Sequence, residues 1–406
     1  MFCYFVILRD LRLSPAQLQR ISVAAAGGAV VASLCSIAVA QILLGLATAF
    51  ALFQWKARRF PPIGWSLAAF VGLSLLAVAA SDNPAAGVPQ LRKFFVYLIL
   101  FALASALRRW LEVRYILAGI AAAGTLSGLW SFVQYARKYA AAKAAGVDFT
   151  LAYIADRTTG FMSHWMTFGG EMMIVLLLAL AWLLFTKDWR AAVVALITGV
   201  ALLLGQTRGM WIGAGAGVLY LVWSWKRPVV LALPVLAALI LAVGPATLQD
   251  RALSIVRPRG ELDSNAHRQA MFRTGLAIIQ AHPFLGIGPE MVKTKFGEYA
   301  PADIPRPFPI HWWFGHLHNI YLHFAAERGI PALVALLTMI GTALWAFLRG
   351  ARQTADPERR AVLHGIAAVI IGVMTAGFFE YNLGDSEVLQ LFLGLLVVGF
   401  FTVRVE

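Results

Sequence analysis

Long apolar runs recur along most of this chain, and short polar segments separate them. Each run covers roughly 17 to 25 residues, enough for a helix to cross a hydrocarbon core about 30 Å thick. A membrane β-barrel would instead show alternating segments of about ten residues. Hydrophobic residues make up 60% of the chain and charged residues only 13%, whereas soluble domains carry about 25% charged residues. The sequence therefore predicts an all-α polytopic membrane protein.

The apolar runs divide into about twelve expected transmembrane helices. They lie near residues 21–36, 38–55, 62–80, 91–107, 113–136, 165–186, 190–205, 210–225, 228–246, 319–348, 361–380 and 385–403. The first two come from one continuous run, Ile21 to Trp55, which as a single helix would be about 52 Å long. That length exceeds one crossing, so we expect a tight hairpin near Cys35 and Ser36.

The basic residues give these expected spans an orientation. Cytoplasmic loops of membrane proteins carry an excess of Lys and Arg. With twelve alternating spans, one face collects Arg9, Arg12, Arg20, Lys56, Arg58, Arg59, Arg108, Arg109, Arg114, Lys187, Arg190, Lys226, Arg227, Arg349, Arg352, Arg359, Arg360 and Arg404. We expect this face and both termini to be cytoplasmic. The net charge of +14 then reflects the membrane faces and implies no nucleic-acid partner.

A long segment, residues 247–317, is expected to form a periplasmic loop with short helices between two bundle segments, residues 1–246 and 318–406. Its middle predicts a helix with Ser264 as N-cap and Pro283 at its end. Within this helix Arg268 shares the apolar face, and Arg273 lies about 140° away.

Three arginines of the outer face are candidates for binding an anionic group. Arg208 lies in "LLLGQTRGMWIGAGAG", where two apolar runs meet with almost no loop, so it is either a site residue beside a helix N-terminus or a snorkelling structural residue. Arg268 needs a partner on its apolar face, and a ligand phosphate would serve. Arg157 is a further candidate, or half of a surface pair with Asp156.

For Arg268, the nearby acids in the sequence that could serve as a protein partner are Glu261, Asp263 and Glu290.

Histidines gather in the stretch "HWWFGHLHNIYLHFAAERGIP", at the expected start of the tenth span. His318 is the candidate general base, because an imidazole titrates near neutrality and can accept a proton from an attacking hydroxyl. Asn319 is expected to orient substrate and Tyr321 to line the same entry. Gly329 and Pro331 are expected to break or kink the helix.

Two other interpretations of these histidines remain open. One is that they fill an interfacial aromatic belt with Trp312 and Trp313, and the other is that they form a metal site. The metal site would draw on His311, His316, His318 and His323. Their spacing is irregular and no acidic ligand stands close in the sequence, which disfavours metal.

The segment "FFEYNLGDSEV" between the last two expected spans places three acids, Glu380, Asp385 and Glu387, at the outer face. These acids could offset the arginines, bind sugar hydroxyls or assist the base. Solvation of two helix ends is the alternative explanation.

Several of these motifs resemble the O-antigen ligase family of the WaaL type. "HN", nine further residues and "GIPA" resemble the family signature around its histidine, with Ala332 where the pattern expects glycine. "TRG" at 207–209, "NAHRQAM" at 265–271 and "HPFLGIG" at 282–288 also fit. The resemblance covers most of the chain. The superfamily also contains O-antigen polymerases and protein O-oligosaccharyltransferases.

The resemblance implies a GT-C-like glycosyltransferase at the periplasmic face of the bacterial inner membrane. It would transfer a glycan from undecaprenyl pyrophosphate to a sugar of lipid A-core, with inversion and without metal or other cofactor. His318 would match the family's histidine, and Arg208 and Arg268 its basic positions. A polymerase or an oligosaccharyltransferase is the alternative enzyme, and a lipid-linked glycan transporter is the non-enzymatic one. The ionisable residues gather on one face rather than at mid-membrane, which disfavours alternating access.

Overall fold

The computed structural model describes residues 14–53, 59–253, 264–304, 306–309 and 314–404, and all regular elements within them are helical. In chain order they are α2 (Pro15–Ala32), α3 (Ile37–Phe53), α4 (Gly64–Ala79), α5 (Pro84–Arg92), η2 (Lys93–Tyr97), α6 (Leu98–Ala106), α7 (Trp110–Ala144), α8 (Phe149–Ala155), α9 (Trp165–Thr186), α10 (Arg190–Leu204), α11 (Arg208–Trp225), η3 (Arg227–Ala232), α12 (Leu233–Val243), α13 (Ala246–Leu253), α14 (Ser264–Ala281), α15 (Val292–Tyr299), α16 (Ile320–Gln353), α17 (Pro357–Ala376), η5 (Asn382–Gly384) and α18 (Ser386–Arg404).

Every expected span coincides with helix, which confirms the all-α prediction for the described residues. Among these residues, six helical segments are long and apolar enough to cross a membrane alone, and four more are apolar but shorter. A polytopic membrane protein is therefore supported, and the count of twelve crossings stays a prediction. The expected hairpin is present, because residues 33–36 separate α2 from α3.

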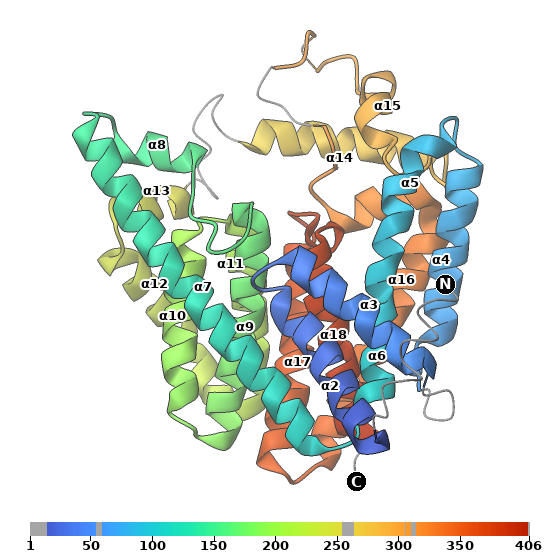
Figure 1. Ribbon diagram of the computed structural model, residues 1–406. Helices are drawn as coiled ribbons and strands as arrows, with labels where there is room; N and C mark the ends of the chain where they lie inside the picture. The colour runs from blue at the N-terminus through green and yellow to red at the C-terminus, as the bar shows by residue number, and fades with distance from the viewer. Residues whose placement is uncertain (1–13, 54–58, 254–263, 305, 310–313, 405–406) are drawn as a thin grey trace.

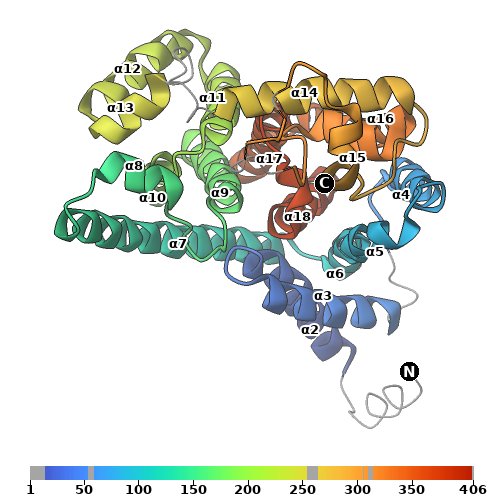
Figure 2. The same ribbon diagram turned by 90° about the horizontal axis from the view of Figure 1, so that it is seen from above.

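The most enclosed helices are α9, α17 and α18, which lie in the middle of the bundle when it is seen from above (Figure 2). Nearly every residue of α18 is buried. By contrast, α12 lies at the edge and has no buried residue. The bundle is thus firmly packed around its centre, and α12 is only loosely attached.

The basic loops meet at one end of the bundle. Glu358, at the start of α17, accepts a hydrogen bond of 2.8 Å from the indole of Trp110 and lies 3.7 Å from the guanidinium of Arg114. These contacts join the starts of α7 and α17. The helices of the long loop, α14 and α15, lie over the opposite end (Figure 1). This arrangement agrees with the predicted alternation, and the assignment of the two ends to cytoplasm and periplasm stays a prediction.

The expected break in α16 is present and anchors the long loop. Gly329 has φ 81° and ψ 162°, outside the helical region. The break leaves the carbonyls of Ala326 and Glu327 without helical partners, and they accept hydrogen bonds from the backbone N–H groups of Ile287 (2.9 Å) and Gly288 (3.0 Å). A Cβ at Gly329 would lie 1.9 Å from the carbonyl oxygen of Phe284. Glycine is therefore required for the loop to approach this closely.

Three expected spans differ in extent from the helices found. Helix α7 continues to Ala144 instead of ending near 136, because the alanine-rich segment after Tyr139 has high helix propensity. The span at 91–107 is interrupted by the 3₁₀ segment η2. The span at 228–246 begins as 3₁₀ helix η3, and its regular helix α12 has only 11 residues.

Candidate functional site

The candidate site forms where the start of α16 meets the end of α17. Asn319 caps α16, because its Oδ1 accepts a hydrogen bond of 3.0 Å from the N–H of Leu322. Its Nδ2 donates to the carbonyl of Phe378 at 3.1 Å. The hydroxyl of Tyr321 donates to the carbonyl of Met374 at 2.7 Å. Both side chains hold the two helix ends together, so their predicted contact with substrate remains a prediction.

His318 directly precedes this cap. Its backbone has φ 48°, and its N–H donates to Nδ1 of His316 at 3.2 Å. This turn aims the imidazole at Glu380, and His318 Nδ1 lies 3.6 Å from Glu380 Oε2. The candidate base therefore faces a carboxylate from a distant part of the sequence.

Glu380 is 2% exposed and lies just beyond the end of α17, in the segment between the last two helices, as expected. Its Oε1 accepts a hydrogen bond of 2.6 Å from Nη2 of Arg268. Burial by itself would raise the pKa of Glu380, but Arg268 and then His318 counteract it and bring the pKa below the usual value. Glu380 is thus an ionised carboxylate held between a guanidinium and an imidazole.

Arg268 comes from α14, which begins at Ser264 and ends just before His282 and Pro283, as predicted. Its guanidinium forms an ion pair with Glu380, 112 positions further along the chain. Glu290 instead accepts hydrogen bonds from the side chains of Gln90 and Lys293. The other two expected partners, Glu261 and Asp263, and the capping side chain of Ser264 lie outside the described residues.

The N-terminus of α11 and the side chain of Arg157 lie near the same carboxylate. Arg208 is 6% exposed and is the first residue of α11. The next residue, Gly209, packs so closely that a Cβ there would lie 3.0 Å from Cγ of Glu380. The N-terminus of α11 therefore abuts Glu380.

Arg157 is 8% exposed, and its guanidinium lies over the ring of Trp165, 5.1 Å from the ring centroid. Burial lowers its pKa to about 10, with Glu380 acting in the opposite direction. Arg157 thus stays cationic at neutral pH. Its expected pairing with Asp156 is not found, because Asp156 forms an ion pair with Lys138.

Further histidines surround His318. The rings of His316 and His267 have centroids 4.3 and 5.3 Å from that of His318. Burial, followed by the nearby histidines His318 and His323, lowers the pKa of His316 well below the usual value. His267 precedes Arg268 in "NAHRQAM", so the motif itself is the only signal in the sequence that could have identified it.

His323 belongs to a second buried group one turn further along α16. Its Nε2 lies 3.3 Å from Oε2 of Glu327, which is also 3.3 Å from the guanidinium of Arg328. The guanidinium of Arg328 also donates a hydrogen bond of 3.3 Å to Oε1 of Gln90. This group links α16 to α5 and holds the loop end of the bundle together.

Asp385 and Glu387 lie away from His318 and make no contact with it. The hydroxyl of Thr167 donates to Asp385 Oδ2 at 2.9 Å. Burial raises the pKa of Asp385 to about 6. No contact between Asp385 and the other site residues supports its predicted role in orienting substrate.

Two hollows flank the site. One of about 290 Å³ is lined by Arg268, His318, Asn319 and Phe378, among others. The second, of about 400 Å³, is an apolar groove between α10 and α12, and it reaches Gln206. The guanidinium of Arg157 lies 3.5 Å from the carbonyl of Gln206. The groove therefore opens beside the arginines.

A metal site finds no support within the described part of the chain. No group of three or more histidine, cysteine or acidic side chains there has the arrangement to hold an ion. His311, one of the four expected ligands, lies outside the described residues, as do Trp312 and Trp313.

A family model described as O-antigen ligase matches residues 191–337. The family expected from the sequence motifs is therefore confirmed over this segment. It contains Arg208, Arg268 and His318, and the flanking Arg157 and Glu380 lie outside it. No curated protein matches the chain. Members of the O-antigen ligase family are glycosyl-transferring ligases and polymerases, which use lipid-linked glycans.

Proposed function

We propose that this chain is an O-antigen ligase that transfers a glycan from undecaprenyl pyrophosphate to a hydroxyl of lipid A-core at the periplasmic face of the inner membrane. The observation that carries the proposal is that the buried carboxylate of Glu380 pairs with Arg268 and faces His318. The N-terminus of α11, where Arg208 lies, packs against the same side chain, and Arg157 lies close enough to lower its pKa. The family match supports the substrate class.

We assign His318 the role of general base. Glu380 faces Nδ1 of His318 at 3.6 Å, so Nδ1 carries the proton and Nε2 is assigned to the acceptor. As the acceptor oxygen forms its bond to the anomeric carbon, the bond from that carbon to the pyrophosphate oxygen breaks, and the acceptor proton moves to Nε2. Glu380 stabilises the resulting imidazolium. Direct displacement gives inversion at the anomeric carbon.

The arginines supply charge for the leaving group. Pyrophosphate gains negative charge as the bond breaks, and fixed guanidiniums stabilise that charge most strongly in the transition state. The buried Nε–H groups of Arg157 and Arg268 have no acceptor among the described residues. An orphaned buried donor is costly, and phosphate oxygens would satisfy both. Arginine thus replaces a metal ion in this scheme.

The two hollows fit the two lipid substrates. The apolar groove between α10 and α12 opens beside Arg157 and suits part of the polyprenyl tail of the donor. The hollow lined by Arg268 and His318 suits the sugar of the acceptor. The donor pyrophosphate then lies between the arginines, next to Glu380.

The decisive test is transfer by purified chain in liposomes with lipid-linked glycan and lipid A-core. Wild type is expected to transfer, and His318→Ala to lose at least about a hundredfold in rate with normal membrane abundance. Near-normal transfer by His318→Ala contradicts the base assignment. Added chelator should leave the rate unchanged, and inhibition by chelator contradicts the arginine scheme.

A deletion strain separates the ligase from its alternatives. Core without any glycan ladder, together with accumulated lipid-linked polymer, supports the ligase. A single-repeat band indicates a polymerase instead. A transporter would keep much of its activity in the His318→Ala variant, because transport needs no general base.

Arg268 and Arg273 form a matched pair on α14. Arg268 contacts Glu380, whereas Arg273 is exposed and pairs with Asp303. In the same transfer assay, Arg268→Gln should lower the rate by about a hundredfold, and Arg273→Gln should change it less than twofold. Equal losses from both variants would show that α14 contributes only general positive charge.

A further inference from the structure

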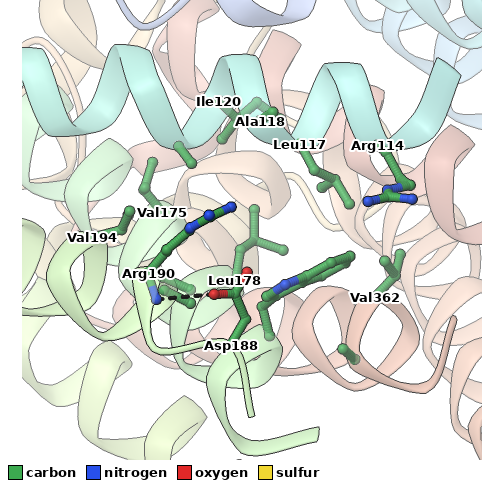
Figure 3. A pocket seen from close by; sticks show the side chains of 15 residues that line it. Arg114, Leu117, Ala118, Ile120, Val175, Leu178, Asp188, Arg190, Val194 and Val362 are labelled. Atoms are coloured by element: carbon green, nitrogen blue, oxygen red, sulfur yellow. Dashed lines mark hydrogen bonds between the residues drawn. The ribbon is translucent and has the colours of Figure 1, made fainter. Parts of the chain in front are cut away.

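A separate cavity (Figure 3) lies toward the end of the bundle where α7, α10 and α17 begin, opposite the candidate site. It has a volume of about 340 Å³, and α7, α9, α10 and α17 form its walls. Alanines at positions 118, 121, 179 and 191 leave the space that larger side chains would fill. From Arg114 to Ala121 the wall extends about 10 Å along α7. That is about two thirds of one leaflet's hydrocarbon depth.

The inner wall of the cavity is almost wholly apolar. Ile120, Val175 and Leu178 line it away from the mouth, and Trp182 lies nearer the basic end of α9. In a bilayer such a space is filled by hydrocarbon, because water gains no hydrogen bonds there. The occupant therefore has at least one acyl chain.

The mouth of the cavity is cationic. Arg114 on α7 and Arg190 at the start of α10 both line it, and Figure 3 shows their side chains reaching toward the space between the helices. Arg114 lies 3.7 Å from Glu358 and is 53% exposed. Among the described residues, no carboxylate lies within ion-pair distance of the guanidinium of Arg190.

One carboxylate, that of Asp188, also lines the mouth. Its Oδ1 accepts a hydrogen bond of 3.0 Å from the backbone N–H of Arg190, so it caps α10 (Figure 3). Glu358 offsets part of the charge of Arg114, so the positive charge offered to a phosphate comes mainly from Arg190, with the half-exposed Arg114 as a second donor. This positive charge attracts the phosphate of a lipid headgroup and repels the ammonium group that a zwitterionic headgroup also carries.

We infer that this cavity binds an anionic phospholipid of the leaflet opposite the candidate site, with one acyl chain in the apolar space and the phosphate at Arg114 and Arg190. Basic pockets between helices at this depth suit anionic headgroups. A zwitterionic phospholipid would bring its own cation to the guanidiniums, and free phosphate would leave the apolar space unfilled. The site is independent of the proposed transfer reaction.

The lipid would brace the helices that carry the candidate site. Helices α9 and α17 wall the cavity at one end of the bundle. At the other end α9 begins at Trp165, beneath Arg157, and α17 ends just before Glu380. Bound lipid replaces a void between these helices and should stabilise the folded state.

The test uses the full chain in detergent. Its melting temperature is measured against added phosphatidylglycerol, phosphatidylcholine or inorganic phosphate, and native mass spectrometry counts retained lipids. Wild type should be stabilised by phosphatidylglycerol at concentrations about tenfold lower than those of phosphatidylcholine, and unaffected by phosphate. The doubly substituted Arg114→Gln/Arg190→Gln protein should lose this preference.

Two controls make the result decisive. Arg349→Gln/Arg352→Gln removes the same charge from exposed residues of the same end and should keep the preference. Ala121→Leu fills the apolar space without changing charge and should weaken retention of phosphatidylglycerol. Equal stabilisation by both lipids, full stabilisation by phosphate alone, or an unchanged preference in Arg114→Gln/Arg190→Gln each overturns the inference.

Discussion

Glu380 organises the candidate site, because one carboxylate contacts both the base and an arginine. Glu380→Gln keeps the shape of the side chain and removes the charge. We expect a loss of transfer of about a hundredfold or more, since the imidazolium of His318 loses its counterion. The variant should fold, and reconstituted transfer kinetics measure the effect. A rate within threefold of wild type would remove Glu380 from the mechanism.

Asp385 gives a pH dependence with a definite sign. Its pKa is raised to about 6 by burial, whereas an unfolded aspartate titrates near 3.9. Between these values the folded state binds more protons, so stability falls as pH rises through this window. Asp385→Asn should therefore be more stable than wild type at pH 7, by up to about 3 kcal/mol.

The difference for Asp385→Asn should vanish near pH 4. Melting temperatures in detergent across this range measure it. A variant that is less stable than wild type at pH 7 would show that the charged form is favoured, and that the hydrogen bond from Thr167 outweighs burial.

At the scale of elements, the break in α16 is the most sensitive feature. Gly329→Ala places a Cβ against the carbonyl of Phe284 and should cost about 2–4 kcal/mol through backbone strain and a displaced loop. Gly341→Ala, on the same helix, meets nothing within 4 Å and should be neutral or stabilising. Thermal unfolding of both variants measures the contrast. Similar losses would mean that α16 tolerates no alanine for a reason other than loop docking.

Local patterns predicted the elements well. The hairpin after α2, the ends of α14 and the break at Gly329 all depend on residues close in the sequence. Glu380 is among the acids that the sequence offers to offset the arginines, but its specific pairing with Arg268 could not be predicted, because the two residues lie 112 positions apart and no spacing rule connects them. His267 could not be assigned to the histidine cluster for the same reason, since its ring reaches that of His318 only when α14 lies across the start of α16.

At the scale of the whole molecule, the predicted orientation can be tested by cysteine labelling. Arg306→Cys lies in the long loop and Gln353→Cys at the end of α16, both exposed. In cells with Cys3 and Cys35 replaced by serine, a membrane-impermeant maleimide should label only the first. Labelling of Gln353→Cys should need permeabilised cells, because that end is expected to be cytoplasmic. The reverse labelling pattern would place the candidate site on the cytoplasmic face and would contradict the predicted orientation.

The salt bridge between Arg268 and Glu380 joins helix α14 of the long loop to the carboxylate that faces His318. If α14 lifts away to admit a large lipid substrate, Glu380 loses its guanidinium and the leaving group loses one of its counterions at the same moment. In the proposed reaction, such an open arrangement would separate the residues of the candidate site, so that water entering with the substrate would meet an incomplete site and would not hydrolyse the donor.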